Sequence, residues 1–218
     1  MIRKVLGIYY SPVGGTANMT RRLAGDIARA LNECSPDEIG VECYDLRDGS
    51  EEPIVMSDET IAVVGMPVHV GKIPLPGADA MKRISGKSAM TIAAVTYGGR
   101  SYGNALFELQ HILEDCGQKV IGAGAFMVSY QALRGSQRSA APAMDTAALA
   151  EFGKAASAKI QRLGGCEIEG LRIKPMPVEL RGRMPVHKVS RISPKAAAAA
   201  QAVLEMLSRR KRNSEWFL

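Results

Sequence analysis

The sequence has few cysteines, few histidines and no long apolar run, and each shortage excludes a class of protein. Its four cysteines form no CxxC pair, so their spacing predicts neither an iron–sulfur cluster nor a zinc site. Its three histidines are separated and have no paired carboxylates, which gives no other metal site. No apolar stretch approaches the roughly 20 residues of a membrane span. The apolar run near the start is too short for a signal peptide, so we expect a cytoplasmic protein without membrane contact.

Positive charge is concentrated at one end of the chain. The 218 residues carry a formal net charge of +6. Residues 1–180 contain 19 basic and 20 acidic residues, whereas residues 181–218 contain nine basic and two acidic ones. A nearly neutral body with a basic tail favours docking of an acidic partner over binding of nucleic acid. A solvated tail without a partner is the alternative.

Strands and helices alternate up to residue 163. Short apolar or β-branched runs predict five strands, at residues 3–10, 40–46, 60–66, 89–96 and 119–128. Apolar residues at helical spacing predict helices at residues 16–33, 78–84, 104–116 and 145–163. The turn-rich stretch 47–59 predicts that a second helix is missing or distorted. The alternation predicts one α/β domain, residues 1–163, with a parallel sheet covered on both faces.

Residues 164–218 do not continue this alternation. Prolines interrupt residues 164–193, which predicts an extended arm rather than a second domain. Residues 194–212 predict a basic C-terminal helix, because Pro194 suits a first helical turn and a run of alanines follows. Residues 216–218 add an apolar tip that we expect to be exposed. The arm would bind an acidic partner or join two copies of the chain in a homodimer.

Three loops follow strands whose carboxyl ends share one edge of such a sheet. The first places the hydroxyls of Ser11 and Thr16 around two glycines at the start of a helix, where N–H groups can bind an anion. The second, residues 66–74, is held by two prolines and can lie against a flat ring. The third, residues 96–104, combines glycines with two tyrosines that can pack on an aromatic ring. Each loop alone also fits a plain turn, but together they favour a binding site.

These loops resemble the phosphate loop and the two isoalloxazine loops of flavodoxin-like FMN proteins. Ser11, Gly14 and Thr16 match the pattern Ser/Thr-x-Thr-Gly-x-Thr, with Val13 in place of the usual hydroxyl. The sequence is more similar to the flavodoxin half of the EFR1-type flavodoxin/ferredoxin family, whose Tyr-x-Ser-Pro-x-Gly pattern occurs at residues 9–14. No CxxCxxCxxxCP sequence follows, so the ferredoxin half is absent.

The resemblance implies a flavodoxin-like, doubly wound sheet of five parallel strands in the order 2-1-3-4-5, with FMN at its carboxyl edge. It implies a flavoprotein that exchanges electrons with a ferredoxin or another redox protein. An NAD(P)H-dependent quinone or flavin reductase is one alternative, and a cofactor-free interaction module of the same fold is another. No catalytic residue is assigned. The residues expected to contact FMN are Ser11, Val13, Gly14, Gly15, Thr16 and Asn18 at the phosphate, and Pro67, Val68, His69, Val70, Thr96, Tyr97, Gly98, Gly99 and Tyr102 at the ring.

The charge of the two ring loops predicts the direction of the flavin potential. Neither residues 66–74 nor residues 96–104 contain an aspartate or glutamate, whereas Lys72 and Arg100 are basic. A nearby cation favours the anionic reduced flavin. We therefore expect a potential above that of ordinary flavodoxins.

Overall fold

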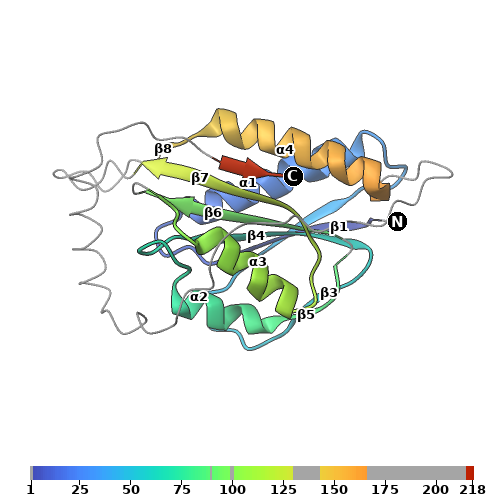
Figure 1. Ribbon diagram of the computed structural model, residues 1–218. Coiled ribbons are helices and arrows are strands. Elements are labelled where there is room, and N and C mark those ends of the chain that lie inside the picture. Colours follow the sequence, from blue (N-terminus) through green and yellow to red (C-terminus); the bar gives the residue numbers. More distant parts are fainter. Residues whose placement is uncertain (1, 89, 99–100, 130–142, 166–214) are drawn as a thin grey trace.

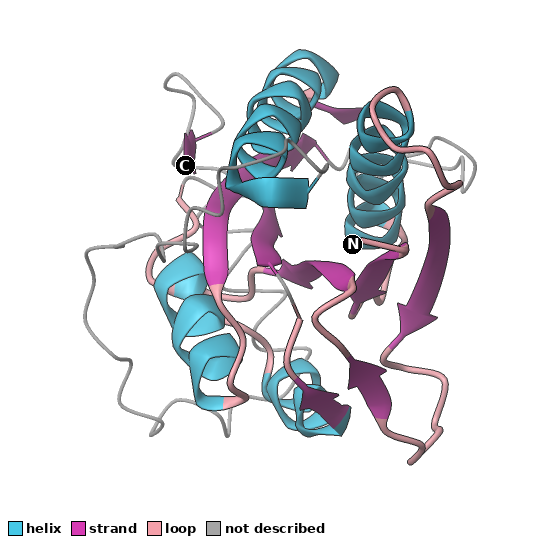
Figure 2. Ribbon diagram, turned by 90° about the vertical axis from the view of Figure 1, so that its right-hand side faces the viewer, coloured by secondary structure: helices cyan, strands magenta, loops and turns pink. Residues whose placement is uncertain are grey.

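A twisted main sheet runs through the described part of the protein, with helices on both faces (Figures 1 and 2). The computed structural model describes residues 2–88, 90–98, 101–129, 143–165 and 215–218. The parallel strands of the sheet, in spatial order, are β2 (Gly40–Asp45), β1 (Lys4–Tyr9), β4 (Thr60–Pro67), β6 (Met90–Tyr97) and β7 (Val120–Ser129). The helices α1 (Gly15–Asn32) and α4 (Thr146–Ile160) cover one face, and α2 (Leu75–Ala80) and α3 (Ala105–Asp115) cover the other.

The doubly wound, mainly parallel α/β fold predicted from the sequence is confirmed, and among the described residues the main sheet adds two short strands to its five parallel ones. Two short strands, β8 (Ala143–Met144) and β9 (Glu215–Phe217), pair antiparallel with β7. Two more, β3 (Ile54–Met56) and β5 (Ile84–Gly86), form a separate parallel pair. Strands of two or three residues show no hydrophobic period, so the sequence pattern does not reveal them.

The central strands are buried because helices cover both of their faces. Every residue of β4 and of β6 is buried, as their continuous apolar runs predict. On one face, α1 buries Leu23 and Ile27 in a cluster that also contains Phe152 of α4. On the other face, α3 buries Leu106 and Leu109. No helix among the residues described is long and apolar enough to cross a membrane.

Helix ends differ from the sequence prediction at two places near the sheet's carboxyl edge. The predicted helix 16–33 begins one residue earlier, with Gly14 at its N-cap, so Thr16 lies inside the first turn. The predicted helix 78–84 begins at Leu75 instead, where Pro76 suits the first turn, and Met81–Arg83 continue it as a 3-10 turn. The predicted helix 145–163 is α4, which is capped by Asp145 because its side chain accepts a hydrogen bond from the backbone N–H of Ala148 at 3.0 Å.

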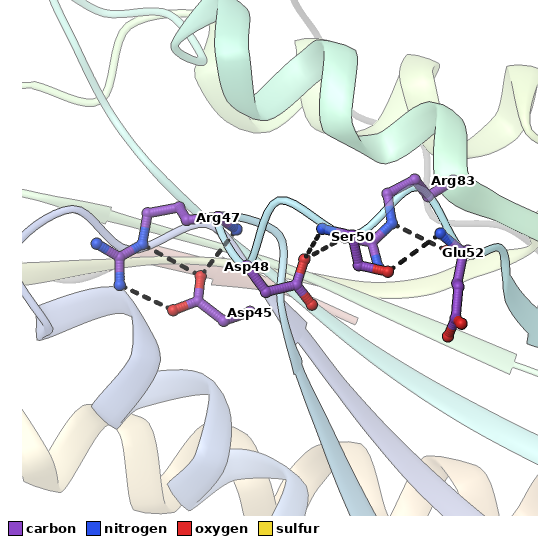
Figure 3. Close-up of polar contacts among 6 residues, drawn as sticks. All are labelled: Asp45, Arg47, Asp48, Ser50, Glu52 and Arg83. Atoms are coloured by element: carbon purple, nitrogen blue, oxygen red, sulfur yellow. Dashed lines mark hydrogen bonds and ion pairs between the residues drawn. The ribbon is translucent and has the colours of Figure 1, made fainter.

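Polar contacts replace the missing helix between β2 and β4 (Figure 3). Residues 47–53 contain no helix, as the sequence predicts. Asp45 and Arg47 form an ion pair of 2.8 Å at the end of β2. Arg83 donates to the Asp48 carboxylate at 2.8 Å and to the Glu52 carbonyl at 3.0 Å. The connection is thus held to the 3-10 turn after α2 by one side chain that is only 14% exposed.

Replacement of Arg83 by Met should destabilise the protein most at neutral pH. The hydrogen bond to the Glu52 carbonyl contributes about 1–2 kcal/mol. A hydrogen bond from the Ser50 N–H, and then Arg83 itself, lower the pKa of Asp48. Stability that depends on a lowered carboxyl pKa is present above the ordinary value of about 3.9 and is lost as the pH falls through the folded-state pKa.

Urea unfolding at several pH values tests this prediction. The difference in unfolding free energy between wild type and Arg83→Met should shrink as the pH falls below about 4. Lys82→Met is the control, because its ion pair with Asp79 is exposed and contributes little. A difference that stays constant down to pH 2 would contradict the assigned role of Arg83.

The C-terminal residues join the sheet instead of projecting from it. Trp216 pairs with Gly124 and lies 6.1 Å, between ring centroids, from Phe152 of α4. Leu218 reaches the position that a side chain at Gly122 would occupy, at 2.9 Å. The side chains of residues 216–218 keep 37–41% of their surface exposed. Of the expected arm and C-terminal helix, residues 166–214 lie outside the described residues.

Candidate functional site

The first loop, residues 11–16, connects β1 to α1 at the carboxyl edge of the sheet (Figure 1). Gly14 has a φ of 88°, in the region that favours glycine, and a Cβ there would meet nothing within 4 Å. A helix start leaves N–H groups without intrahelical acceptors. The N–H groups of Gly15 and Thr16 donate to no atom among the residues that the structure describes. These two N–H groups are therefore free to bind an anion, with the positive end of the helix dipole behind them, and we refer to them as the anion cradle.

Two buried hydroxyls border this cradle. Ser11, 1% exposed, accepts a hydrogen bond from the N–H of Ala17 at 3.0 Å, which leaves its own O–H proton to donate elsewhere. Thr16 and Thr96 share a buried hydrogen bond of 2.7 Å between their hydroxyl oxygens. Only one of those two protons is used in the shared bond, so the other is available to a ligand. The same bond joins the first loop to the third.

The second loop turns sharply at Val70 and Gly71. His69 and Lys72 exchange two backbone hydrogen bonds, of 2.8 and 3.1 Å, across this turn. Both central residues have positive φ, 52° for Val70 and 75° for Gly71. This geometry is unfavourable for a β-branched residue, so the loop holds Val70 in a strained conformation with an exposed side chain.

The second and third loops are in contact with one another. The Asn104 N–H donates to the Gly71 carbonyl at 2.9 Å, and the Val68 N–H donates to the Thr96 carbonyl at 2.8 Å. A Cβ at Gly103 would lie 2.6 Å from the Gly71 backbone, so only glycine fits there. The two loops therefore form one structural unit, anchored at the start of α3.

Aromatic and imidazole side chains lie in this unit. The rings of Tyr97 and Tyr102 are 5.7 Å apart between centroids and are tilted by 59°. Tyr97 is buried, whereas Tyr102 is half-buried. His69 is exposed, yet desolvation by the surrounding protein lowers the pKa of its imidazole, which favours the neutral form of the ring.

Known structures share this arrangement of sheet and helices. The chain is similar to a flavodoxin from the domain Archaea, with a TM-score of 0.50 and 18% identity over 72% of this chain and 99% of that one. It is also similar to an NADH:FMN oxidoreductase in its apo form, with a TM-score of 0.52 and 12% identity over 80% of this chain and 95% of that one. The fold is flavodoxin-like. The sequence matches no protein-family model and no curated protein.

The flavodoxin-like fold brings the predicted site residues to one edge of the sheet. Thr96 is joined to Thr16, and Val68 to Thr96, by the bonds described above. Pro67 ends β4, and Gly98, which is buried, follows β6. In the first loop, Val13, Gly14 and Asn18 are at least partly accessible, whereas Gly15 is buried in the first turn of α1. Gly99 lies outside the described residues.

Two further contributors to the site were not predicted from the sequence. Glu108 of α3 is buried and accepts a hydrogen bond from the Ile73 N–H of the second loop at 2.9 Å. Gly65 of β4 faces α1 so closely that a Cβ there would lie 1.9 Å from the Thr20 hydroxyl. The signals in the sequence were a glutamate beside the apolar stripe of a helix and a glycine inside an apolar strand.

Proposed function

We propose that this protein is an FMN-binding flavoprotein that transfers electrons. The observation that carries the proposal is the meeting of three loops at one sheet edge. An anion cradle with unused N–H groups lies in the first, and a buried hydroxyl pair, Thr16 and Thr96, joins it to the third. Gly71 and Gly103 bring the second and third loops together. The similarity to an archaeal flavodoxin and to an NADH:FMN oxidoreductase supports the same conclusion through the fold.

The donor set of the first loop fits a terminal phosphate. Backbone N–H groups of Gly15 and Thr16 and the O–H protons of Ser11 and Thr16 are all donors, and no carboxylate occurs in residues 11–16 to repel an anion. The second and third loops would flank the flavin ring with Val68, His69, Tyr97 and Gly98. Bound FMN would supply the redox chemistry, and the chain would hold and orient it.

A separate redox protein is the proposed electron partner. The chain resembles the flavodoxin half of a flavodoxin/ferredoxin protein, but it has no cysteine motif for a cluster of its own. The excess of basic residues after residue 180 supports an acidic partner, such as a ferredoxin.

Titration of the apo protein with FMN and with riboflavin tests the proposal. Quenching of flavin fluorescence should show a stoichiometric complex with FMN. Riboflavin, which lacks the phosphate, should bind at least tenfold more weakly because it cannot use the first-loop cradle. Equal affinity for the two flavins would contradict the cradle, and no binding of either would contradict the proposed function. Rapid NADH or NADPH oxidation by the holoprotein alone would instead indicate the reductase alternative.

Val13→Thr should increase the affinity for FMN. Val13 is 64% exposed and occupies the position where the resembling family usually has a hydroxyl. A new hydroxyl can donate to the phosphate, and a net hydrogen bond contributes about 1 kcal/mol, which corresponds to about fivefold in Kd. Val13→Ala is the control and should leave Kd nearly unchanged. If Val13→Thr binds FMN no more tightly than Val13→Ala, residue 13 does not contact the phosphate.

A further inference from the structure

A buried carboxylate lies against the second loop, and it belongs to a residue outside the three loops that the sequence analysis singled out. Glu108 is the fourth residue of α3 and is only 4% exposed. Its Oε2 accepts a hydrogen bond from the Ile73 N–H at 2.9 Å, across 35 positions of sequence. Ile73 and Pro74, which end the second loop, are also buried. The carboxylate therefore contacts the backbone of a loop expected to flank the flavin.

The charge of Glu108 has weak compensation. None of the ion pairs formed by the described residues includes Glu108. Its stabilisation comes from the Ile73 N–H and from the positive end of the α3 dipole. Burial of a carboxylate is costly, and a neutral amide could accept the same hydrogen bond. The hydrogen bond alone therefore does not require a charged side chain.

Two contacts from the start of α3 fix the second loop. The N-cap residue Asn104 donates to the Gly71 carbonyl, and Glu108, one turn later, accepts from Ile73. The close packing of Gly103 on Gly71 adds to the first contact. The carboxylate thus holds the segment that follows the strained turn at Val70.

We propose that Glu108 is a positioning residue for the flavin-binding second loop and supplies the negative charge that both ring loops lack. This inference rests on the proposed function. A fixed negative charge near the ring disfavours the anionic reduced flavin. The flavin potential should therefore be lower than the basic composition of the loops predicts.

Three variants separate the positioning role from the charge. Glu108→Gln keeps an acceptor oxygen for Ile73 but removes the charge, and Glu108→Ala removes both. Asp115→Asn is the control, because Asp115 is an exposed acid at the opposite end of the same helix. The measurements are the Kd for oxidised FMN, the midpoint potentials, and the hydrogen-exchange rate of the Ile73 amide in the apo protein.

Each variant has a distinct expected result. In Glu108→Gln, the Kd for oxidised FMN should change by less than about threefold. The affinity for reduced relative to oxidised FMN should rise severalfold, because removal of a fixed negative charge near the ring favours the anionic reduced flavin. In Glu108→Ala, exchange of the Ile73 amide should accelerate at least tenfold and FMN should bind about tenfold more weakly. Asp115→Asn should match wild type in all three measurements.

Two outcomes would overturn the inference. Potentials in Glu108→Gln equal to those of Asp115→Asn would refute the role of the charge. Wild-type exchange of the Ile73 amide in Glu108→Ala would refute the positioning role. Failure of the wild-type protein to bind FMN would contradict the proposed function instead, and the exchange measurement on the apo protein would still test the contact between Glu108 and the second loop.

Discussion

Gly65→Ala should destabilise the fold by about 2–3 kcal/mol and weaken FMN binding about tenfold. A Cβ at this position would lie 1.9 Å from the Thr20 hydroxyl oxygen and 3.2 Å from the Thr16 methyl carbon. Thr20 is fully buried and β-branched, so its side chain has little freedom to move away. The strain would push the first turns of α1 off the sheet. Those turns carry the N–H groups of the anion cradle.

Thr20 variants provide the matched test of this mechanism. Thr20→Ala removes the nearest clashing atom and should restore most of the stability and FMN affinity of Gly65→Ala. Thr20→Val keeps the same volume and should restore neither. The Thr20 hydroxyl has no hydrogen-bond partner among the described residues, so Thr20→Val alone should cost little, whereas Thr20→Ala alone also loses a buried methyl group, which costs about 1 kcal/mol. Urea unfolding and FMN titration of the double variants are the measurements, and equal rescue by Ala and Val would contradict the steric explanation.

Thr16→Val should weaken FMN binding by about 10- to 150-fold. The substitution keeps the shape of the side chain but removes its hydroxyl. A hydrogen bond to a charged group contributes about 1.5–3 kcal/mol, which corresponds to that range of Kd. It also leaves the Thr96 hydroxyl buried without the partner it has at 2.7 Å, which should lower the unfolding free energy by about 1–3 kcal/mol.

Thr96→Val distinguishes the ligand contact from the internal bond. If the Thr16 proton is donated to phosphate, Thr96 serves only to position it. Thr96→Val should then weaken FMN binding only a few fold, and the double variant should bind no more weakly than Thr16→Val. Isothermal titration calorimetry of the three variants gives the comparison. The titrations are done without urea, at a temperature where all three variants are folded. Unchanged affinity in Thr16→Val would show that its hydroxyl does not contact the phosphate.

The fold was predictable because its signals are local. The apolar runs of β4 and β6 and the amphipathic spacing of α1 each lie within one segment, and burial on both faces of the sheet follows from them. The loop of glycines and hydroxyls between β1 and α1 is also a local pattern, so its position at a helix start could be predicted. The strands β8 and β9 could not, because two or three residues pair through backbone groups that every sequence has.

The sequence by itself determined the alternation of strands and helices, the cradle after β1, and the edge of the sheet at which the three loops meet. Only the tertiary structure decided which side chains touch there. The Thr16–Thr96 bond spans 80 positions and the Glu108–Ile73 bond spans 35, and Gly65 is constrained by a residue of α1. Such contacts depend on how closely separate elements approach one another. That distance is set by packing of the whole core, so no local sequence pattern contains it.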